Sequence, residues 1–324
     1  MDRLRIFVDL EMATDVLNLL RTRTAGHELI LPPTPVPSVL AKADPDPQFR
    51  TADIAFGQPD PQAIVDARSL KWIHISSSGI TRYDNPEFRA LMRSRQIVVS
   101  NSATVFQEAC ATHALSFILA QARKLPRALV TRSVNTSSEW KALRGSSAVL
   151  RGDTLLIVGF GAIGRRLAEL LQPLGLNVMA CRRKPDGDEK VTVVTPDQLD
   201  GAIGLADHIM NILPDSVATR NFFDASRFAA MKPGAMFYNI GRGATVDQQA
   251  LAEALPAGRV GAAWLDVTEP EPLPEGHPLL AAPNFFITPH PAGGHADETT
   301  TLVSHFLDNF SRYVRGESLI DRVI

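Results

Sequence analysis

The sequence has few cysteines, no surplus of positive charge and no long hydrophobic run, and each absence excludes a class of protein. Its two cysteines, Cys110 and Cys181, are too few for a disulfide framework, so we expect a reducing compartment. Lys and Arg number 33 against 35 Asp and Glu, which disfavours nucleic acid and anionic membranes as partners. No apolar window approaches the roughly 20 residues that span a bilayer, and the N-terminal apolar stretch is too short for a signal peptide. We therefore expect a cytoplasmic protein.

What the sequence does contain is an ordinary globular composition, with 45% hydrophobic residues. At roughly 150 residues per domain, 324 residues predict about two domains. Short apolar segments alternate with helical patterns, which is typical of parallel βαβ units. Strands are predicted at 4–8, 54–56, 72–75, 97–99, 155–158, 177–180, 191–193, 208–212, 235–240, 261–265 and 285–287. We therefore expect an α/β protein with two Rossmann-like lobes and a cleft between them.

The two strand series are separated by a segment of different character. A long apolar helix is predicted at 106–125, ending at Pro126, and the polar stretch 135–147 is either a linker or a subunit-contact loop. The N-terminal series includes a helix at 12–20 and a proline-rich connection at 31–48. An amphipathic helix at about 297–314 follows the last strand.

A glycine-rich turn follows the apolar strand at 155–158. It reads G-x-G-x-x-G over Gly159–Gly164 and precedes a helical pattern. Gly159 permits a tight turn, Gly161 lets the backbone approach a pyrophosphate, and Gly164 allows close packing of helix and strand. The first N–H groups of the helix, at Ala162 and Ile163, would face the phosphates. This context favours dinucleotide binding over a purely structural turn.

Three cations, Arg182, Arg183 and Lys184, stand at the end of the second strand of this unit. An NAD enzyme commonly places Asp or Glu there to bind the ribose 2′-hydroxyl. Guanidinium groups can instead bind a 2′-phosphate through paired hydrogen bonds. The sequence therefore favours NADP(H) over NAD(H), the alternative being a solvated basic loop without a cofactor role.

Three further segments follow predicted strands and hold groups suited to hydride transfer with a 2-oxo acid. These segments are 239–243, 265–272 and 288–291. A histidine can exchange the proton that alkoxide formation requires, a carboxylate can orient that histidine, and an arginine can bind the substrate. The carboxyl ends of strands in open α/β sheets are where ligands bind.

These motifs together resemble the D-isomer-specific 2-hydroxyacid dehydrogenase family over nearly the whole chain. The match includes the glycine motif, N-x-x-R-G at Asn239–Gly243, the D-V segment with its two E-P pairs at Asp266–Pro272, which reads D-V-T-E-P-E-P, and T-P-H at Thr288–His290. The basic end of the second strand resembles the NADPH-preferring glyoxylate/hydroxypyruvate reductase branch.

The resemblance implies a role for individual residues. It makes Arg242 the substrate-binding arginine, Glu271 the acid that orients the histidine, and His290 the acid/base. Asp266 would contact the nicotinamide end of the cofactor. In the first lobe, the backbone N–H groups of Ser78, Gly79 and Ile80 would receive the substrate carboxylate, a plain turn being the alternative.

The family also implies topology and assembly. A flavodoxin-like substrate domain would be formed by residues 1–102 plus 291–324, with a doubly wound dinucleotide-binding domain at 103–290. Family members are usually homodimers, and Trp140 would then either reach a neighbouring active site or serve its own subunit. Thr112 stands where the family often has glutamate. His113 is expected to be structural, His295 either lines the pocket or does not, and Cys181 is expected to be a packing residue.

Two other functions remain open at this point. One is a cofactor-sensing, corepressor-like binding protein on the same fold, which would need no acid/base. The other is the same oxidoreductase class acting on a different small acid, such as phosphite or formate. No metal site is expected, because His290 and His295 in a glycine-rich loop give poor support for zinc.

Overall fold

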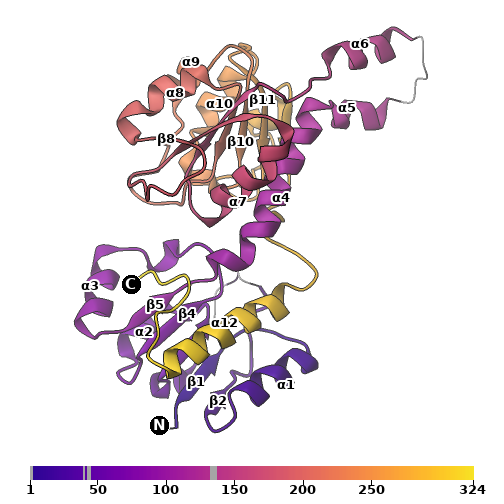
Figure 1. Cartoon of the computed structure of the whole chain (residues 1–324). Coiled ribbons are helices and arrows are strands. Elements are labelled where there is room, and N and C mark those ends of the chain that lie inside the picture. The colour runs from indigo at the N-terminus through magenta and orange to yellow at the C-terminus, as the bar shows by residue number, and fades with distance from the viewer. Residues whose placement is uncertain (1–2, 39–40, 42–44, 132–136) are drawn as a thin grey trace. The chain divides into compact units, whose positions relative to one another are not determined.

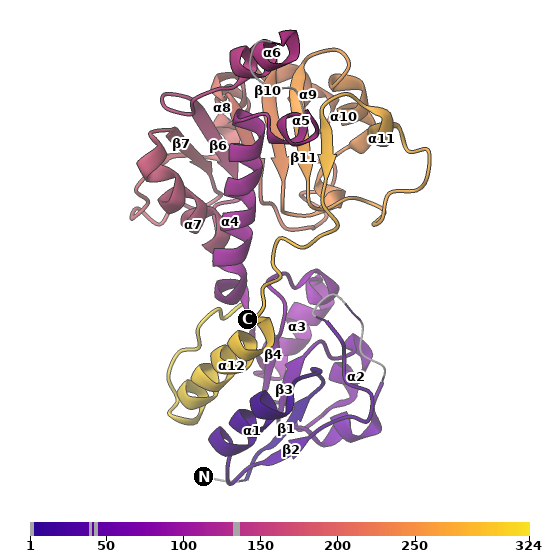
Figure 2. The same cartoon turned by 90° about the vertical axis from the view of Figure 1, so that its right-hand side faces the viewer.

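The computed structural model describes residues 3–38, 41, 45–131 and 137–324 of the chain. These residues form two compact units, each with its own parallel sheet (Figures 1 and 2). The first unit consists of Met1–Phe106 and Gly294–Ile324, and the second of Gln107–Gly293. The predicted α/β class is therefore confirmed. The junctions expected from the sequence, at 102/103 and 290/291, each precede those of the two units.

The first unit has a five-stranded sheet in the order β2-β1-β3-β4-β5. Its strands are β1 (Arg5–Val8), β2 (Glu28–Ile30), β3 (Ile54–Gly57), β4 (Trp72–Ile75) and β5 (Val98–Ser100). Its helices are α1 (Thr14–Arg23), α2 (Pro61–Asp66), α3 (Pro86–Ser94) and α12 (Glu298–Val314), with 3₁₀ turns η1 (Pro47–Thr51) and η2 (Thr81–Tyr83). Strand β2 was not expected, because Ile30 is the one buried side chain among its three residues and gives no periodic signal.

The C-terminal helix α12 completes the core of this N-terminal sheet. The ring of Phe306 stacks on that of Phe56 at 4.3 Å between centroids and lies 5.3 Å from that of Trp72. Both Phe56 and Trp72 belong to central strands and are fully buried. In Figures 1 and 2, α12 lies beside α1. The two ends of the chain are thus joined in one unit by apolar packing.

The second unit has a seven-stranded parallel sheet in the order β12-β11-β10-β9-β6-β7-β8. Its strands are β6 (Thr154–Val158), β7 (Asn177–Cys181), β8 (Thr192–Val194), β9 (His208–Asn211), β10 (Ala235–Asn239), β11 (Val260–Leu265) and β12 (Phe285–Ile287). The chain builds outward from β6 in one direction to β8, then returns to β9 and builds outward in the other. Doubly wound sheets bind ligands at the carboxyl ends of strands beside such a reversal.

The helices of the second unit occur along the chain between residues 103 and 281. They are α4 (Ala103–Ala122), α5 (Leu125–Val130), α6 (Ser138–Ser146), α7 (Ala162–Leu171), α8 (Leu199–Leu205), α9 (Ala225–Ala230), α10 (Gln248–Ala254) and α11 (Pro278–Ala281), with 3₁₀ turns η3 (Gln172–Leu174), η4 (Pro196–Gln198) and η5 (Gly243–Thr245). Helix α4 begins in the first unit and continues into the second.

The segment after α4 differs from the sequence prediction. Pro126 does not end the long helix, which stops at Ala122; it lies in the first turn of α5, where its missing N–H has no helical partner to lose. The polar stretch expected as a linker or loop contains helix α6, capped by the side chain of Ser137. Asn135 and Thr136 of that stretch lie outside the described residues. A helix forms here although the composition is polar, because the side chain of Ser137 accepts a hydrogen bond from an N–H group at the helix start.

Candidate active site

Three chain segments leave the second sheet at the carboxyl ends of neighbouring strands. Arg242 follows β10, Asp266 follows β11 and His290 follows β12. Because β10, β11 and β12 pair in parallel, these ends lie along one edge of the sheet. The fold thus gathers at one edge the segments in which the sequence predicted catalytic groups.

His290 and Glu271 form the hydrogen-bonded pair that the sequence predicted. Nδ1 of the imidazole lies 3.1 Å from Oε1 and 3.2 Å from Oε2 of the carboxylate. A carboxylate only accepts hydrogen bonds, so Nδ1 carries the shared proton and Nε2 is the nitrogen that can exchange a proton with another molecule. His290 has a φ of +56°, which is uncommon for a non-glycine residue and typical of functional sites. The N–H of His290 donates to the carbonyl oxygen of Asp266 at 3.1 Å and holds this conformation.

Arg242 is a half-buried cation at the start of η5. Burial lowers the pKa of its guanidinium group, and Glu271 acts in the opposite direction. Its Nη1 donates to the carbonyl oxygen of Gly241 at 2.6 Å. Its own carbonyl oxygen accepts from Nδ2 of Asn239 at 3.1 Å and from Oγ1 of Thr245 at 2.6 Å. These hydrogen bonds fix the backbone that carries Arg242, and the charge of its side chain is suited to binding an anion.

Asp266 holds the segment around His290 in place. Its carboxylate is almost completely buried and accepts from Oγ1 of Thr288 at 2.6 Å and from the N–H of Ala292 at 3.1 Å. His113 of α4 completes the group, with Nε2 3.5 Å from Oδ1 of Asp266. Burial lowers the pKa of His113 while Asp266 opposes that shift. Sequence reasoning did not connect His113 with this segment, because His113 and Asp266 are far apart in the sequence.

The glycine-rich turn has the close approaches that its motif predicts. Gly159 has a φ of +100°, and a Cβ atom there would lie 2.7 Å from the carbonyl oxygen of Ile212. A Cβ atom at Gly164 would lie 2.9 Å from the carbonyl oxygen of Gly159, so helix and strand pack closely. A Cβ atom at Gly161 would meet nothing within 4 Å, which leaves this side of the turn open.

Helix α7 starts directly after this open side. Its first helical hydrogen bond runs from the N–H of Arg165 to the carbonyl oxygen of Gly161. The N–H groups of Ala162, Ile163 and Gly164 precede that bond and have no helical partner, as in any helix start. Together with the open face at Gly161, these donors fit the pyrophosphate of a dinucleotide.

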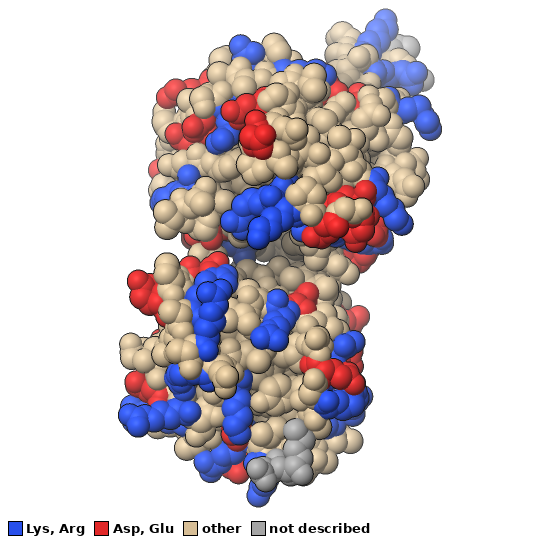
Figure 3. Space-filling view, turned by 60° about the vertical axis from the view of Figure 1, so that its left-hand side comes forward, with Lys and Arg blue, Asp and Glu red and all other residues tan. Residues whose placement is uncertain are grey.

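The arginine at the end of β7 is paired with acids. Nη1 of Arg182 donates to Oδ2 of Asp186 at 2.5 Å and to Oε1 of Glu189 at 2.9 Å. Backbone N–H groups, led by that of Asp186, lower the pKa of Glu189 to about 2, so this carboxylate is anionic. Arg183 and Lys184 are exposed. Over the face drawn in Figure 3, small groups of basic and of acidic side chains are scattered among other residues.

Sequence reasoning missed one residue of this group, Arg165 in the first turn of α7. Its Nη2 also lies 2.5 Å from Oδ2 of Asp186. The carboxylates of Asp186, Asp188 and Glu189 lie close enough together to hold a metal ion. Arg165 and Arg182 already bind these carboxylates, so the group is a mixed-charge network with its cations built in.

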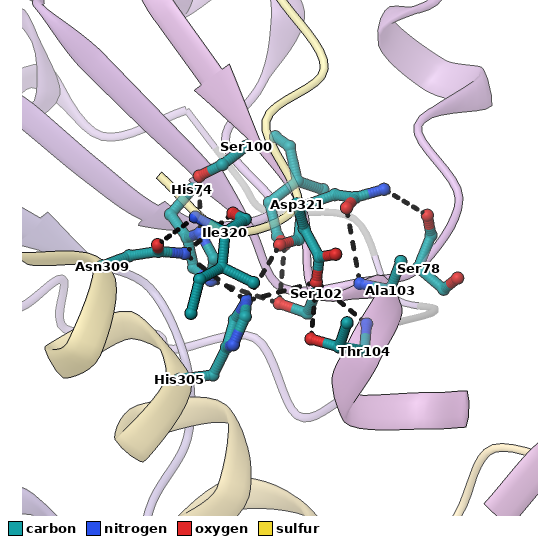
Figure 4. Close-up of polar contacts among 12 residues, drawn as sticks. His74, Ser78, Ser100, Ser102, Ala103, Thr104, His305, Asn309, Ile320 and Asp321 are labelled. Carbon is teal, nitrogen blue, oxygen red and sulfur yellow. Dashed lines mark hydrogen bonds and ion pairs between the residues drawn. The ribbon is translucent and has the colours of Figure 1, made fainter. Parts of the chain in front are cut away.

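In the first unit, a loop follows β4 at residues 76–80. The amide of Gln58 donates to Oγ of Ser76 at 3.1 Å and to Oγ of Ser77 at 3.0 Å, which holds the start of the loop. Nδ2 of Asn101 donates to the carbonyl oxygen of Ser78 at 2.6 Å (Figure 4). Within the described residues, the N–H groups at positions 78–80 make no hydrogen bond to the protein.

A polar network behind this loop attaches the C-terminal segment to the start of α4 (Figure 4). Oδ2 of Asp321 accepts from the N–H of Thr104 at 2.9 Å and from its Oγ1 at 2.7 Å. Nε2 of His305 in α12 lies 3.4 Å from the same carboxylate oxygen. Asn101 precedes this helix start, so the network fixes the residue that holds the loop.

The remaining residues singled out from the sequence have plain environments. The ring of Trp140 lies on α6 beneath the guanidinium of Arg144, 4.8 Å away. Thr112 is exposed on α4. Cys181 packs in the core of the second unit, where burial raises the pKa of its thiol to about 11. His295 belongs to the first unit, and its carbonyl oxygen accepts from the N–H of Glu298.

Comparisons with known proteins agree with this geometry. Residues 115–292 match the family model described as D-isomer specific 2-hydroxyacid dehydrogenase, NAD binding domain. Glyoxylate/hydroxypyruvate reductase B of Escherichia fergusonii is 35% identical over 72% of each chain, and that of Citrobacter koseri is 34% identical over 83% of each. The NADPH-dependent glyoxylate/hydroxypyruvate reductase of Sinorhizobium meliloti, solved with NADP and malonate, is 25% identical with a TM-score of 0.73, covering 99% of this chain and 97% of that one.

No helix in the described part of the chain has the length and apolar character needed to cross a membrane. The sheet edge that carries Arg242, Glu271 and His290, the glycine-rich turn and the sequence matches all point to one class of oxidoreductase with a nicotinamide cofactor. The chain belongs to the D-isomer-specific 2-hydroxyacid dehydrogenase family.

Proposed function

We propose that this enzyme reduces a small 2-oxo acid to the 2-hydroxy acid with NADPH, with glyoxylate, hydroxypyruvate and phenylpyruvate-like acids as the candidates. One observation carries the proposal: His290 is hydrogen-bonded to Glu271 at the same sheet edge as the half-buried Arg242. A protein that only senses a cofactor needs no acid/base pair. The relatives named glyoxylate/hydroxypyruvate reductase support the substrate class.

The proposed chemistry assigns one task to each side chain. When bound, the reduced nicotinamide would supply the hydride that the carbonyl carbon of the 2-oxo acid accepts. Nε2 of His290 would give a proton to the carbonyl oxygen, which becomes the hydroxyl group of the 2-hydroxy acid. Glu271 keeps the Nδ1 proton in place and stabilises the imidazolium form that must exist before transfer. Arg242 binds the substrate carboxylate and polarises the carbonyl.

The cofactor would be held by the second unit. Gly159, Gly161 and Gly164 shape the turn, and the N–H groups of Ala162 and Ile163 receive the pyrophosphate. Asp266 would contact the nicotinamide end while it holds the His290 segment. Arg182 and Arg183 favour NADPH over NADH, because a 2′-phosphate needs cations where an NAD enzyme has a carboxylate.

The first unit would supply the substrate-binding loop. Ser78, Gly79 and Ile80 offer three successive N–H groups that make no hydrogen bond to the described protein. Such groups favour a carboxylate, which accepts several hydrogen bonds at once. The malonate in the Sinorhizobium meliloti structure is a small acid of the kind proposed here.

We propose a homodimer that uses the segment of α5 and α6. Neither helix has a buried residue, and Leu129, Val130 and Val149 in and after them are more than 70% exposed. Leu129 and Val130 are consecutive, and contiguous exposed apolar surface is typical of protein–protein contacts. Trp140 would lie within or beside that contact.

A screen of 2-oxo acids tests the function. NADPH and NADH oxidation is followed in the presence of glyoxylate, hydroxypyruvate, phenylpyruvate and pyruvate, with phosphite and formate assayed against NADP⁺ and NAD⁺. We expect turnover with at least one 2-oxo acid, at a higher kcat/KM with NADPH. Cofactor binding without oxidation across the whole panel would contradict the proposal and favour a sensing role.

A further inference from the structure

Two guanidinium groups from separate elements converge on one carboxylate oxygen. Arg165 comes from α7 and Arg182 from the end of β7, yet Nη2 of the first and Nη1 of the second each lie 2.5 Å from Oδ2 of Asp186. One anionic atom thus bridges two cations. A phosphate dianion bridges paired guanidinium groups in the same way and carries twice the charge.

The acids around these arginines differ in how firmly they are held. Glu189 has a side chain only 3% exposed and accepts from the N–H groups of Asp186 and Gly187 at 2.7 and 2.8 Å. It is a fixed part of the loop and positions Arg182. The side chain of Asp186 is 51% exposed. Asp186 can therefore turn into solvent, which leaves the two guanidinium groups facing a common space.

That space lies at the end of the sheet where nucleotide binding is proposed. Arg182 follows β7 and is next in space to the end of β6, because these strands pair in register up to Val158 and Cys181. Arg165 lies in the first helical turn after the glycine-rich segment. The adenosine ribose of a bound dinucleotide is recognised at this strand end.

We propose that Arg165 and Arg182 together bind the 2′-phosphate of NADPH, and that Asp186 is a built-in competitor which the phosphate displaces. This inference rests on the proposed function and adds two residues that set its cofactor preference. Arg165 raises the affinity for the 2′-phosphate. Asp186 lowers it, because part of the phosphate attraction is used to separate an existing ion pair.

Binding of nucleotide fragments tests the proposal without turnover. Isothermal titration calorimetry measures adenosine 2′,5′-bisphosphate and 5′-AMP binding to the full-length enzyme. We expect Arg165→Gln to weaken 2′,5′-bisphosphate binding about tenfold, as for loss of a charged hydrogen bond, and to leave 5′-AMP binding unchanged. Arg165→Lys should restore part of that loss, since a point charge remains without the fork.

Asp186→Asn tests whether the carboxylate of Asp186 competes with the 2′-phosphate. It should tighten 2′,5′-bisphosphate binding several-fold, by about the worth of one charged contact, with no change for 5′-AMP. Asp188→Asn is the matched control, because it removes the same charge from the same loop; of the two arginines, Asp188 pairs with Arg165, at 3.2 Å, and not with Arg182 within the described residues. We expect a clearly smaller effect from it.

The outcomes separate this inference from the proposed function. Equal weakening of both fragments by Arg165→Gln, or no change with either, would overturn the role of Arg165. Equal effects of Asp186→Asn and Asp188→Asn would overturn the competitor, since only general charge would then matter. The wild-type enzyme could reduce a 2-oxo acid in the screen while the variants show the same ratio of 2′,5′-bisphosphate affinity to 5′-AMP affinity as the wild type. The inference would then fail and the proposed function would stand.

Discussion

The seven-stranded sheet carries two groups of charged side chains, one beside strands β10–β12 and one beside strands β6–β8, and the two groups differ in how firmly they are held. At β10–β12, Asp266 is buried and Arg242 and His290 are half-buried, and hydrogen bonds to or from the backbone hold the segments that carry them. At β6–β8, the half-buried Arg165 and Arg182 share the carboxylate of Asp186, whose exposed side chain is free to give way to another anion. Burial makes an arrangement costly to change, whereas exposed ion pairs contribute little to stability. The reacting end is therefore expected to be intolerant of substitution and the cofactor-selecting end to be tunable.

The largest effect is expected at the reacting end. His290→Ala removes the proton donor, and kcat should fall by about 10³-fold, within the range for loss of general acid–base catalysis. The dissociation constant of NADPH, measured by fluorescence titration, should stay close to that of the wild type, and Arg242→Ala should behave alike. Near-wild-type turnover of either variant across the 2-oxo acid panel would remove the basis of the comparison.

A pH effect in the first unit has to be separated from any pH dependence of turnover. Burial raises the pKa of Asp9 from 3.8 to about 6, although the N–H of Gln58 and the charge of Arg82 oppose this shift. The folded state then holds a proton that the unfolded state has lost, so stability falls as pH rises from about 4 to 6. A shift of about two units corresponds to about 3 kcal/mol.

Asp9→Asn tests this pH effect. The variant keeps an acceptor for Gln58 and lacks the titration, so its stability relative to the wild type should rise by about 3 kcal/mol between pH 4 and pH 8. Urea unfolding of both proteins across this range provides the measurement. Parallel stability–pH curves would show that Asp9 does not titrate in this range.

The orienting acid should matter less than the histidine that it orients. Glu271→Gln replaces an acceptor-only group with one that can also donate, so the imidazole loses its fixed tautomer and kcat should fall about 10²-fold. Glu269→Gln is the matched control from the same loop and should leave kcat unchanged, since the histidine contacts Glu271. If Glu269→Gln lowered kcat more than Glu271→Gln does, Glu269 and not Glu271 would be the acid that orients the histidine.

The smallest effect is expected at the cofactor-selecting end. Arg182→Asp places a carboxylate where it repels a 2′-phosphate and can accept from a ribose hydroxyl. The ratio of kcat/KM with NADPH to that with NADH should fall by about tenfold or more, while the best 2-oxo acid stays the same. An unchanged ratio would remove the argument for NADPH.

The same contrast explains what the sequence could predict. His290, Glu271 and Arg242 stand in short motifs directly after buried strands, and the alternation of strands and helices alone brings those strand ends together. The contact between Arg165 and Asp186 joins residues 21 apart through exposed side chains, and no period or motif marks it. His113 is missed for a similar reason, because its partner Thr288 lies 175 residues away. Helix α6 was missed because its polar residues resemble a loop until the cap at Ser137 is seen.

A single-turnover experiment tests the central claim most directly. Wild-type enzyme and His290→Ala are loaded with NADPH, mixed with the best 2-oxo acid from the screen, and followed by nicotinamide absorbance. We predict that the wild type oxidises one NADPH per active site and releases one 2-hydroxy acid, while His290→Ala binds NADPH equally well and oxidises it about 10³-fold more slowly. Equal oxidation rates in the two proteins would contradict the assignment of the proton to His290, and with it the account of the reacting end.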